Sequence, residues 1–163
     1  MIEELNQILP QIPKLLLNNK WDSLLINKYP PVIYRLSLKI SNDRTLLLHK
    51  LFNTNSDQAL MHSHSWPLAC KVLNGEYETG IGYSNDRNHT PKSDFTSFVK
   101  SGDIYEILSP NLWHYTKPVK NCKFTYSVLL IGERCRERKA ENNDKLSETN
   151  KQEMFSWFKE NLK

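Results

Sequence analysis

Residues 59–80 read ALMHSHSWPLACKVLNGEYETG, and this stretch decides the fold prediction. It places two histidines, His62 and His64, just ahead of an apolar run that is broken by Asn74-Gly75. An Asn-Gly pair is a strong hairpin signal because both residues tolerate a positive φ. The stretch therefore predicts a β-hairpin whose first strand follows the two histidines.

The block around this hairpin, residues 30–132, has strand character. Its short apolar or alternating segments are separated by polar turn residues, and residues 83–94 read as a polar loop. Short strands with turns every ~8–12 residues predict an all-β sandwich or small barrel. Besides the hairpin, the predicted strands are VIYRLSLKI (32–40), RTLLLHKLF (44–52), DIYEILSP (103–110) and FTYSVLLIG (124–132).

Both ends of the chain are predicted to be helical. Residues 1–20 read as one helix or two short ones, because two prolines interrupt the pattern. Residues 147–163 read as a second helical segment, with Thr149 and Gln152 spaced for a capping box. One face of this helix is apolar and is expected to pack on the outside of the barrel or on a second subunit. That face consists of Met154, Trp157, Phe158 and Leu162.

Length and composition predict one domain over residues 1–163, with a sizeable core. The net charge of +4 is mild and the Lys and Arg residues are scattered, which argues against nucleic-acid binding. The sequence has no run of ~18 apolar residues, so no membrane span is predicted. The first residues do not have the pattern of a signal peptide. Three well-separated cysteines argue for a reducing compartment, so a cytoplasmic location is expected.

The histidines form a candidate metal site. His62 and His64 project to one face of a strand, since side chains two apart in a strand share a face. His114 follows a Pro-Asn turn at the start of another predicted strand. Three imidazoles that converge inside a barrel suit Fe(II), Mn(II), Ni(II), Cu(II) or Zn(II). The alternative is that each is an ordinary core or surface histidine. His49 is predicted to share a strand face with leucines, and His89 to lie in a loop.

These residues resemble the two sequence motifs of the cupin superfamily. The resemblance implies a double-stranded β-helix (cupin jelly-roll) barrel with a metal ion inside. Leu68 stands where the first motif has a glutamate, so the resemblance implies a three-histidine site without that carboxylate. The matching positions are His62, His64 and Gly75 in the first motif, and Gly102-Asp103, Pro110 and His114 in the second.

A second resemblance is to small bacterial and phage single-domain cupins with a His-x-His-x-Trp signature. It strengthens the predicted fold and metal site and implies no particular substrate. The matching positions are His49-Lys50-Leu51, Ala59-Leu60, His62, His64, Trp66 and Gly75-Glu76-Tyr77.

The three-histidine set is also distantly similar to that of thiol dioxygenases such as cysteine dioxygenase. This similarity implies one divalent metal, with Fe(II) favoured and Zn, Mn or Ni as alternatives. Tyr34-Arg35 resembles the segment in which those enzymes hold an arginine on the substrate carboxylate, and a planar guanidinium suits that task. Tyr126 lies near the position of their tyrosine, which follows the third histidine.

Four further residues are candidates for the pocket. Trp66 neighbours a ligand candidate, and Cys70 shares a strand face with Leu68, so both are candidates to line the cavity. The alternative is that each is an ordinary packing residue of the core. Glu76 and Glu78 share a face of the next strand. If that face is interior, one of them would be a general base or a fourth ligand. The alternative is a solvated strand face.

Three functions are compatible with these residues. The favoured one is a mononuclear non-haem Fe(II) dioxygenase that acts on a small organic substrate, such as a thiol or a carboxylate. The second is a redox-neutral Zn or Mn isomerase or lyase, and the third is a cupin that binds a small ligand without reacting. A homodimer is a further expectation, since cupins commonly pair.

Overall fold

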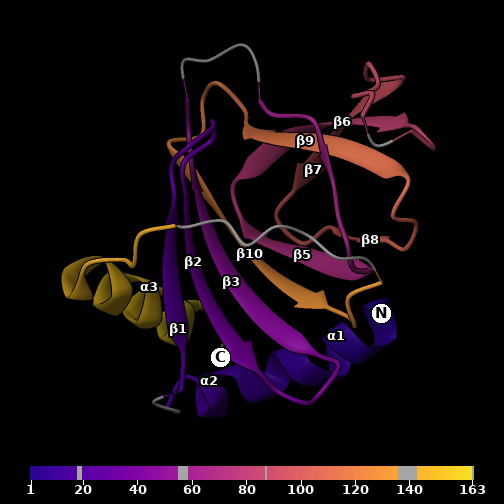
Figure 1. Ribbon diagram of the computed structural model, residues 1–163. Coiled ribbons are helices and arrows are strands. Elements are labelled where there is room, and N and C mark those ends of the chain that lie inside the picture. Colours follow the sequence, from indigo (N-terminus) through magenta and orange to yellow (C-terminus); the bar gives the residue numbers. More distant parts are fainter. Residues whose placement is uncertain (18–19, 55–58, 87, 136–142, 163) are drawn as a thin grey trace.

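The structure is a computed structural model that describes residues 1–163 except 18–19, 55–58, 87, 136–142 and 163. The described strands form two antiparallel sheets (Figure 1). The first sheet has six strands in the order β1 (Asp22–Ile26), β2 (Ile33–Lys39), β3 (Thr45–Phe52), β10 (Phe124–Ile131), β5 (Leu68–Asn74) and β8 (Ile104–Ile107). The second has four strands in the order β4 (His62–Ser63), β9 (Leu112–Pro118), β6 (Glu76–Tyr83) and β7 (Phe95–Lys100).

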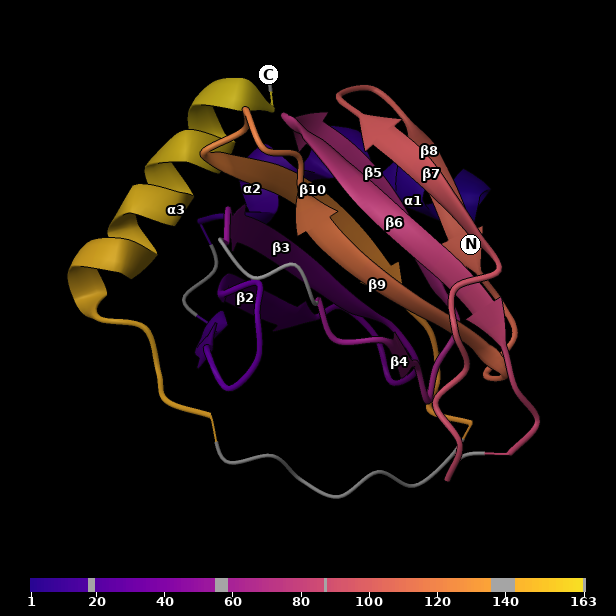
Figure 2. The same ribbon diagram turned by 90° about the horizontal axis from the view of Figure 1, so that it is seen from above.

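The chain crosses repeatedly between the two sheets. After β3 it enters the second sheet at β4, returns at β5, leaves for β6 and β7, and then alternates through β8, β9 and β10. The sheets face each other and enclose the interior of a barrel (Figures 1 and 2). This topology is a double-stranded β-helix, so the predicted jelly-roll barrel is confirmed.

Helices cover the outer face of the six-stranded sheet (Figure 2). They are α1 (Ile2–Ile8), the 3-10 turn η1 (Leu9–Gln11), α2 (Ile12–Leu15) and α3 (Glu148–Asn161). The predicted packing of the last helix on the barrel is confirmed, because Met154 and Phe158 are fully buried against the sheet. No helix among the described residues is long and apolar enough to cross a membrane.

Strand alternation gives the six-stranded sheet two different faces. The outer face supplies the largest apolar core, in which leucines and valines of the central strands meet the helices. The intervening residues of the same strands point into the barrel. The outer-face residues are Leu36, Leu38, Leu46, Leu48, Val128 and Leu130.

A buried ammonium group helps to hold α3 on the sheet. The Lys50 side chain is 5% exposed and forms an ion pair with Glu153 of the helix. Its Nζ lies 4.8–6.0 Å from the centroids of four aromatic rings. Beside it, the Tyr126 ring stacks on Trp157 of α3 with centroids 3.6 Å apart. The four rings belong to Tyr34, Phe52, Phe124 and Tyr126.

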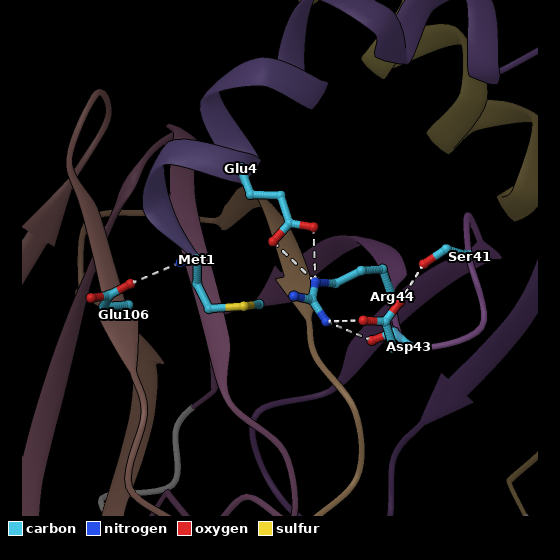
Figure 3. A network of polar contacts seen from close by, with 6 residues as sticks. All are labelled: Met1, Glu4, Ser41, Asp43, Arg44 and Glu106. Carbon is cyan, nitrogen blue, oxygen red and sulfur yellow. Dashed lines mark hydrogen bonds and ion pairs between the residues drawn. The ribbon is translucent and has the colours of Figure 1, made fainter.

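Ion pairs anchor α1 to two parts of the first sheet (Figure 3). The Arg44 Nε donates to both carboxylate oxygens of Glu4, at 2.8 and 3.0 Å. Arg44 also pairs with its neighbour Asp43. The amino group of Met1 lies 3.6 Å from a carboxylate oxygen of Glu106 on β8. These contacts tie the helix to the β2–β3 turn and to the sheet edge.

The structure differs from the sequence prediction at several elements. Strands β1 and β7 lie outside the predicted strand segments. In the predicted hairpin turn only Gly75 has a positive φ, of +82°. A Cβ there would lie 2.7 Å from the Cγ2 of Thr125, so the turn needs glycine for space as well. The predicted capping box at Thr149 is wrong: α3 begins after Ser147, whose hydroxyl accepts from the amide of Asn150.

We expect Ser147→Ala to lower the free energy of unfolding by about 1 kcal/mol, because the first turn of α3 loses its side-chain acceptor. Thr149→Ala is the matched control, since Thr149 is equally exposed but does not cap the helix, and its effect should stay within about 0.5 kcal/mol. Urea unfolding followed by circular dichroism measures both. A larger loss for Thr149→Ala would contradict this assignment.

Candidate metal centre and its cavity

Three histidines from two neighbouring strands meet at one side of the barrel interior. His62 lies on the two-residue strand β4 and is the direct cross-strand partner of His114 on β9. His64 follows two residues later, just past the end of β4. Their ring centroids lie 4.7–5.0 Å apart, and one nitrogen from each ring lies within 4.8 Å of the others. The structure therefore brings the three predicted ligands together.

The ring nitrogens are arranged as a metal ion would require. The Nε2 atoms of His64 and His114 lie 2.8 Å apart. Neighbouring donors around a metal with bonds of about 2.1 Å are separated by about 3 Å, so one ion can bridge this pair. The Nδ1 of His62 hydrogen-bonds the carbonyl oxygen of Leu60 at 2.9 Å, which assigns Nε2 as its donor atom toward a metal.

Burial favours the neutral, ligating form of these imidazoles. The pKa of His114 lies well below its usual value, first because burial penalises the charged ring and second because His62 is close. A neutral imidazole is the form that binds a metal ion. The donor set therefore fits a divalent transition metal without prior loss of a proton.

The three histidines line a cavity of about 210 Å³. This is smaller than the roughly 300–1,000 Å³ of pockets for drug-sized ligands, so the site suits a small molecule. Both sheets contribute to its walls, which are largely apolar. The described residues that line it include one arginine and no aspartate or glutamate. Apolar lining residues include Leu51, Leu60, Trp66, Leu68 and Leu129.

Arg35 and His49 form a pair on the wall that the first sheet provides. They are cross-strand partners on β2 and β3, and the Arg35 Nε donates to the His49 Nε2 at 2.8 Å. The pKa of His49 lies well below its usual value, because the ring is buried and because Arg35 is beside it. His49 is therefore a neutral acceptor, and it does not itself offset the positive charge of the guanidinium.

Two tyrosines and a thiol form a polar group within the same cavity. The Tyr77 hydroxyl donates to the Tyr105 oxygen at 3.0 Å and lies 3.5 Å from the Cys70 Sγ. Burial raises the pKa of both tyrosines well above the usual value and also raises the pKa of the Cys70 thiol. All three groups are therefore uncharged near neutral pH.

A second, larger hollow of about 600 Å³ adjoins the cavity, and Arg35 and Trp66 line both. The guanidinium of Arg134 lies 5.4 Å from the centroid of the Trp66 ring. This outer hollow carries charges of both signs, unlike the described lining of the cavity. Its other charged lining residues are Lys39, Asp43, Glu133 and Arg134.

Most of the predicted pocket residues lie together. Besides the three histidines, Arg35, Trp66 and Cys70 line the cavity, and so does Leu68. Leu68 is 1% exposed and packs with Cys70 in a small apolar cluster. The position where the cupin motif has a glutamate is thus an apolar part of the wall.

Tyr34 and Tyr126 lie on the opposite face of the first sheet and are not among the cavity-lining residues. The Tyr34 hydroxyl accepts from the side-chain amide of Asn150, and Tyr126 packs under Trp157. The reason is strand alternation: Arg35 points inward, so its neighbour Tyr34 points outward. The structure does not bring either tyrosine to the histidines.

Glu76 and Glu78 also point away from the cavity, because Tyr77 between them points in. Glu78 accepts a hydrogen bond from the Tyr115 hydroxyl at 2.6 Å and lies 3.6 Å from the Nζ of Lys117. These contacts place the pair on the outer face of the second sheet. Their predicted role as a base or a fourth ligand would require the other face.

Sequence reasoning missed several polar residues that line the cavity, including the following four. Tyr77 carried a usable signal, since an aromatic residue between two glutamates in a strand points to the buried side. Ser127 carried none, because both of its neighbours, Tyr126 and Val128, are also plausible core residues, and Tyr105 carried a weaker one, since only one of its neighbours, Glu106, is charged. The fourth, His49, was placed on the correct face but without its arginine partner.

Comparison with known proteins identifies the fold. No protein-family model matches the chain, and no curated protein matches it either. Hydroxypropylphosphonic acid epoxidase (HppE) from S. wedmorenis aligns with a TM-score of 0.53 and 14% identity over 69% of this chain and 56% of that one. HppE with Fe(II) and substrate aligns with a TM-score of 0.54 at 14% identity, over 69% of this chain and 57% of that one.

The EutQ protein of Clostridium difficile aligns with a TM-score of 0.50 and 10% identity, over 69% of this chain and 78% of that one. The chain spans little more than half the length of the HppE chains. At these identities the likeness establishes the fold alone. The chain has the cupin fold.

We expect His62→Ala, His64→Ala and His114→Ala each to weaken Co(II) binding by about 100-fold or more. Mutation of a residue that only hydrogen-bonds to a metal-coordinating side chain weakens metal binding about 10- to 100-fold, so loss of a coordinating residue should cost at least as much. His89→Ala is the control, since His89 is exposed and lies outside the group. Titration followed by visible absorption measures the affinity. Unchanged affinity in any of the three variants would contradict the assignment of that ligand.

We expect the metal-free protein to lose stability as the pH falls below about 6.5. Below that pH the unfolded chain protonates its histidines, whereas burial keeps His49 and His114 neutral in the folded state. Stability therefore rises with pH across this window, by at most about 1.4 kcal/mol per pH unit for each histidine.

His49→Gln should reduce this slope. The free energy of unfolding in urea, measured between about pH 5 and about pH 7, gives the slope for this variant and for the unaltered protein. An identical slope in the His49→Gln variant would show that His49 takes up a proton over the same pH range in the folded and the unfolded protein, which would contradict its neutral state in the folded protein.

Proposed function

We propose that this protein is a metal-dependent oxygenase, with Fe(II) held by His62, His64 and His114. Its substrate would be a small organic molecule that carries a carboxylate, such as a thiol acid. The observation that carries the proposal is the shared cavity of three converging imidazoles and one guanidinium. The other features of the cavity are consistent with each part of this proposal.

The donor set is compatible with iron. Three imidazoles suit Fe(II), and they also suit Zn, Mn or Ni. The described lining residues offer no carboxylate as a fourth ligand, and Leu68 stands in the motif position where cupins have one. A bound Fe(II) ion would supply the electron chemistry with O2 and open coordination positions for the substrate.

Arg35 would bind the substrate carboxylate. A guanidinium pairs with a carboxylate through two parallel hydrogen bonds, provided that its plane is correctly oriented. The hydrogen bond from its Nε to His49 fixes that plane. Because His49 is neutral, it orients the guanidinium without cancelling its charge.

The apolar walls would keep water away from the reacting groups. Leu51, Leu68 and Leu129 are buried side chains of the first sheet that line the cavity. In such surroundings the attraction between Arg35 and an anion is stronger than in water. The protein would thus bind and orient the substrate and exclude water, while the metal ion would supply the redox chemistry.

The structural neighbours are compatible with this proposal. HppE has been solved with Fe(II) and substrate, and its chain shares the fold at a TM-score of 0.54. The barrel of this fold can therefore hold a reactive iron centre. The low identity means that the substrate of HppE does not transfer.

The redox-neutral alternative has less support from the geometry. Isomerase or lyase chemistry on Zn or Mn would need a general base near the metal. Glu76 and Glu78 were the candidates, and both point away from the cavity. Burial raises the pKa of both cavity tyrosines well above its usual value, so they stay protonated near neutral pH and are not available as bases.

The proposal is tested by metal analysis and O2 uptake. We expect the untagged protein to bind Fe(II) and to consume O2 with cysteine and 3-mercaptopropionate. Cysteamine, which lacks the carboxylate, should react more slowly. Arg35→Gln should raise KM for the carboxylates by about 10-fold or more, since a hydrogen-bonded charge pair is lost. Lys39→Gln is the control, because Lys39 lines only the outer hollow.

Each outcome has a defined meaning. Bound iron without O2 uptake would eliminate thiol oxidation. Tightly bound zinc without iron would support the redox-neutral alternative. Failure to bind any metal, with His62→Ala unchanged in every assay, would eliminate both enzyme functions.

A further inference from the structure

A row of polar side chains crosses the floor of the cavity. Arg35 on β2 is the cross-strand partner of His49 on β3, and His49 is the partner of Ser127 on β10. All three line the cavity. Adjacent strands lie about 4.8 Å apart, so the backbones of Arg35 and Ser127 are separated by about 10 Å. The row therefore has a cationic end and an uncharged end.

The uncharged end is a group of hydroxyls and a thiol, which we call the hydroxyl cluster: Ser127, Cys70, Tyr77 and Tyr105. The Cys70 Sγ lies 3.5 Å from the Tyr77 hydroxyl. The Tyr77 hydroxyl bonds the Tyr105 oxygen at 3.0 Å. All four side chains line the cavity, so a ligand that fills it meets this cluster.

The hydroxyl cluster borders an apolar part of the core. Tyr77 is 1% exposed and packs with Val72 and Val99, and Tyr105 packs against the same group. The uncharged end of the row therefore adjoins apolar side chains. The outer hollow, in contrast, meets the cavity at Arg35 and Trp66.

The two ends therefore recognise different chemistry. The hydroxyl cluster donates and accepts hydrogen bonds, but the described residues that line the cavity place no charge there. A charged group at this end would be desolvated without a counter-ion, which is strongly unfavourable. An uncharged polar group would exchange hydrogen bonds with the cluster instead.

We propose that the cavity binds short carboxylic acids whose far end carries an uncharged hydrogen-bonding group, such as a hydroxyl. The carboxylate lies at Arg35 and the far end lies at the hydroxyl cluster. The proposal rests on the role of Arg35 in the proposed function and adds the chemistry of the second end. It excludes dicarboxylates and amino acids with a terminal ammonium as preferred ligands.

The test compares acids of equal length that differ only at the far end. Isothermal titration calorimetry on the full chain would use plain, ω-hydroxy and ω-amino acids and diacids of three to five carbons. At the length that spans the row, we expect the ω-hydroxy acid to bind about 10-fold more tightly than the plain acid, the value of one well-made hydrogen bond. The diacid and the ω-amino acid should bind more weakly than the ω-hydroxy acid.

Two variants locate the preference. Tyr77→Phe and Tyr105→Phe keep the rings and remove the hydroxyls, so each should lower the ratio of ω-hydroxy-acid affinity to plain-acid affinity toward 1. Tyr115→Phe is the matched control, because its hydroxyl bonds Glu78 on the outer face. Thermal unfolding of each variant checks that it is folded. The comparison of plain and ω-hydroxy acids on the unaltered protein does not depend on any variant.

Equal binding of plain and ω-hydroxy acids at every length would overturn the inference, as would a preference for the diacid. A preference that survives in both phenylalanine variants would overturn it too. The proposed function fails separately, through the absence of metal or O2 uptake. Loss of binding of all acids in Arg35→Gln supports the cationic end, and binding of no acid by the unaltered protein would overturn both ends.

Discussion

The alternation of side chains along β2, β3 and β10 is the constraint on which the rest of the structure depends. Leucines and valines on one face are buried beneath α1, α2 and α3 in the largest apolar core. Their burial fixes which face of each strand points outward. The residues between them, Arg35, His49 and Ser127, must then point into the barrel. The polar floor of the cavity is thus set by packing on the far side of the sheet.

The cavity combines groups that stay uncharged with a single cationic side chain among its described lining residues. Burial keeps His49 and His114 neutral and keeps the tyrosines protonated. A metal ion would meet neutral imidazoles on the second sheet, and an anion would meet Arg35 on the first. The chemistry of the site is therefore divided between the two sheets that the jelly roll brings face to face.

The sequence was sufficient for the barrel and for the three histidines, because short apolar strands and a motif with fixed spacing are local signals. It was insufficient for the second set of pocket residues. Whether Tyr34 or Arg35 points inward depends on which face of β2 packs against the helices. The apolar core beneath α3 decides this, and the residues of the strand alone do not. The orientation of Glu78 also depends on tertiary contacts. Its carboxylate accepts a hydrogen bond from Tyr115 on the outer face of the second sheet.

Arg35 and Trp66 border both the cavity and the outer hollow, so the Arg35 side chain forms part of the wall of two compartments. An anion that reaches Arg35 from the hollow competes with an anion that reaches it from the cavity. Phosphate or sulfate buffers would then act as competitive inhibitors of a carboxylate ligand, although neither ion needs to approach the histidines. The choice of buffer thus becomes a variable in every measurement on this site, and a non-coordinating cationic buffer is the appropriate medium.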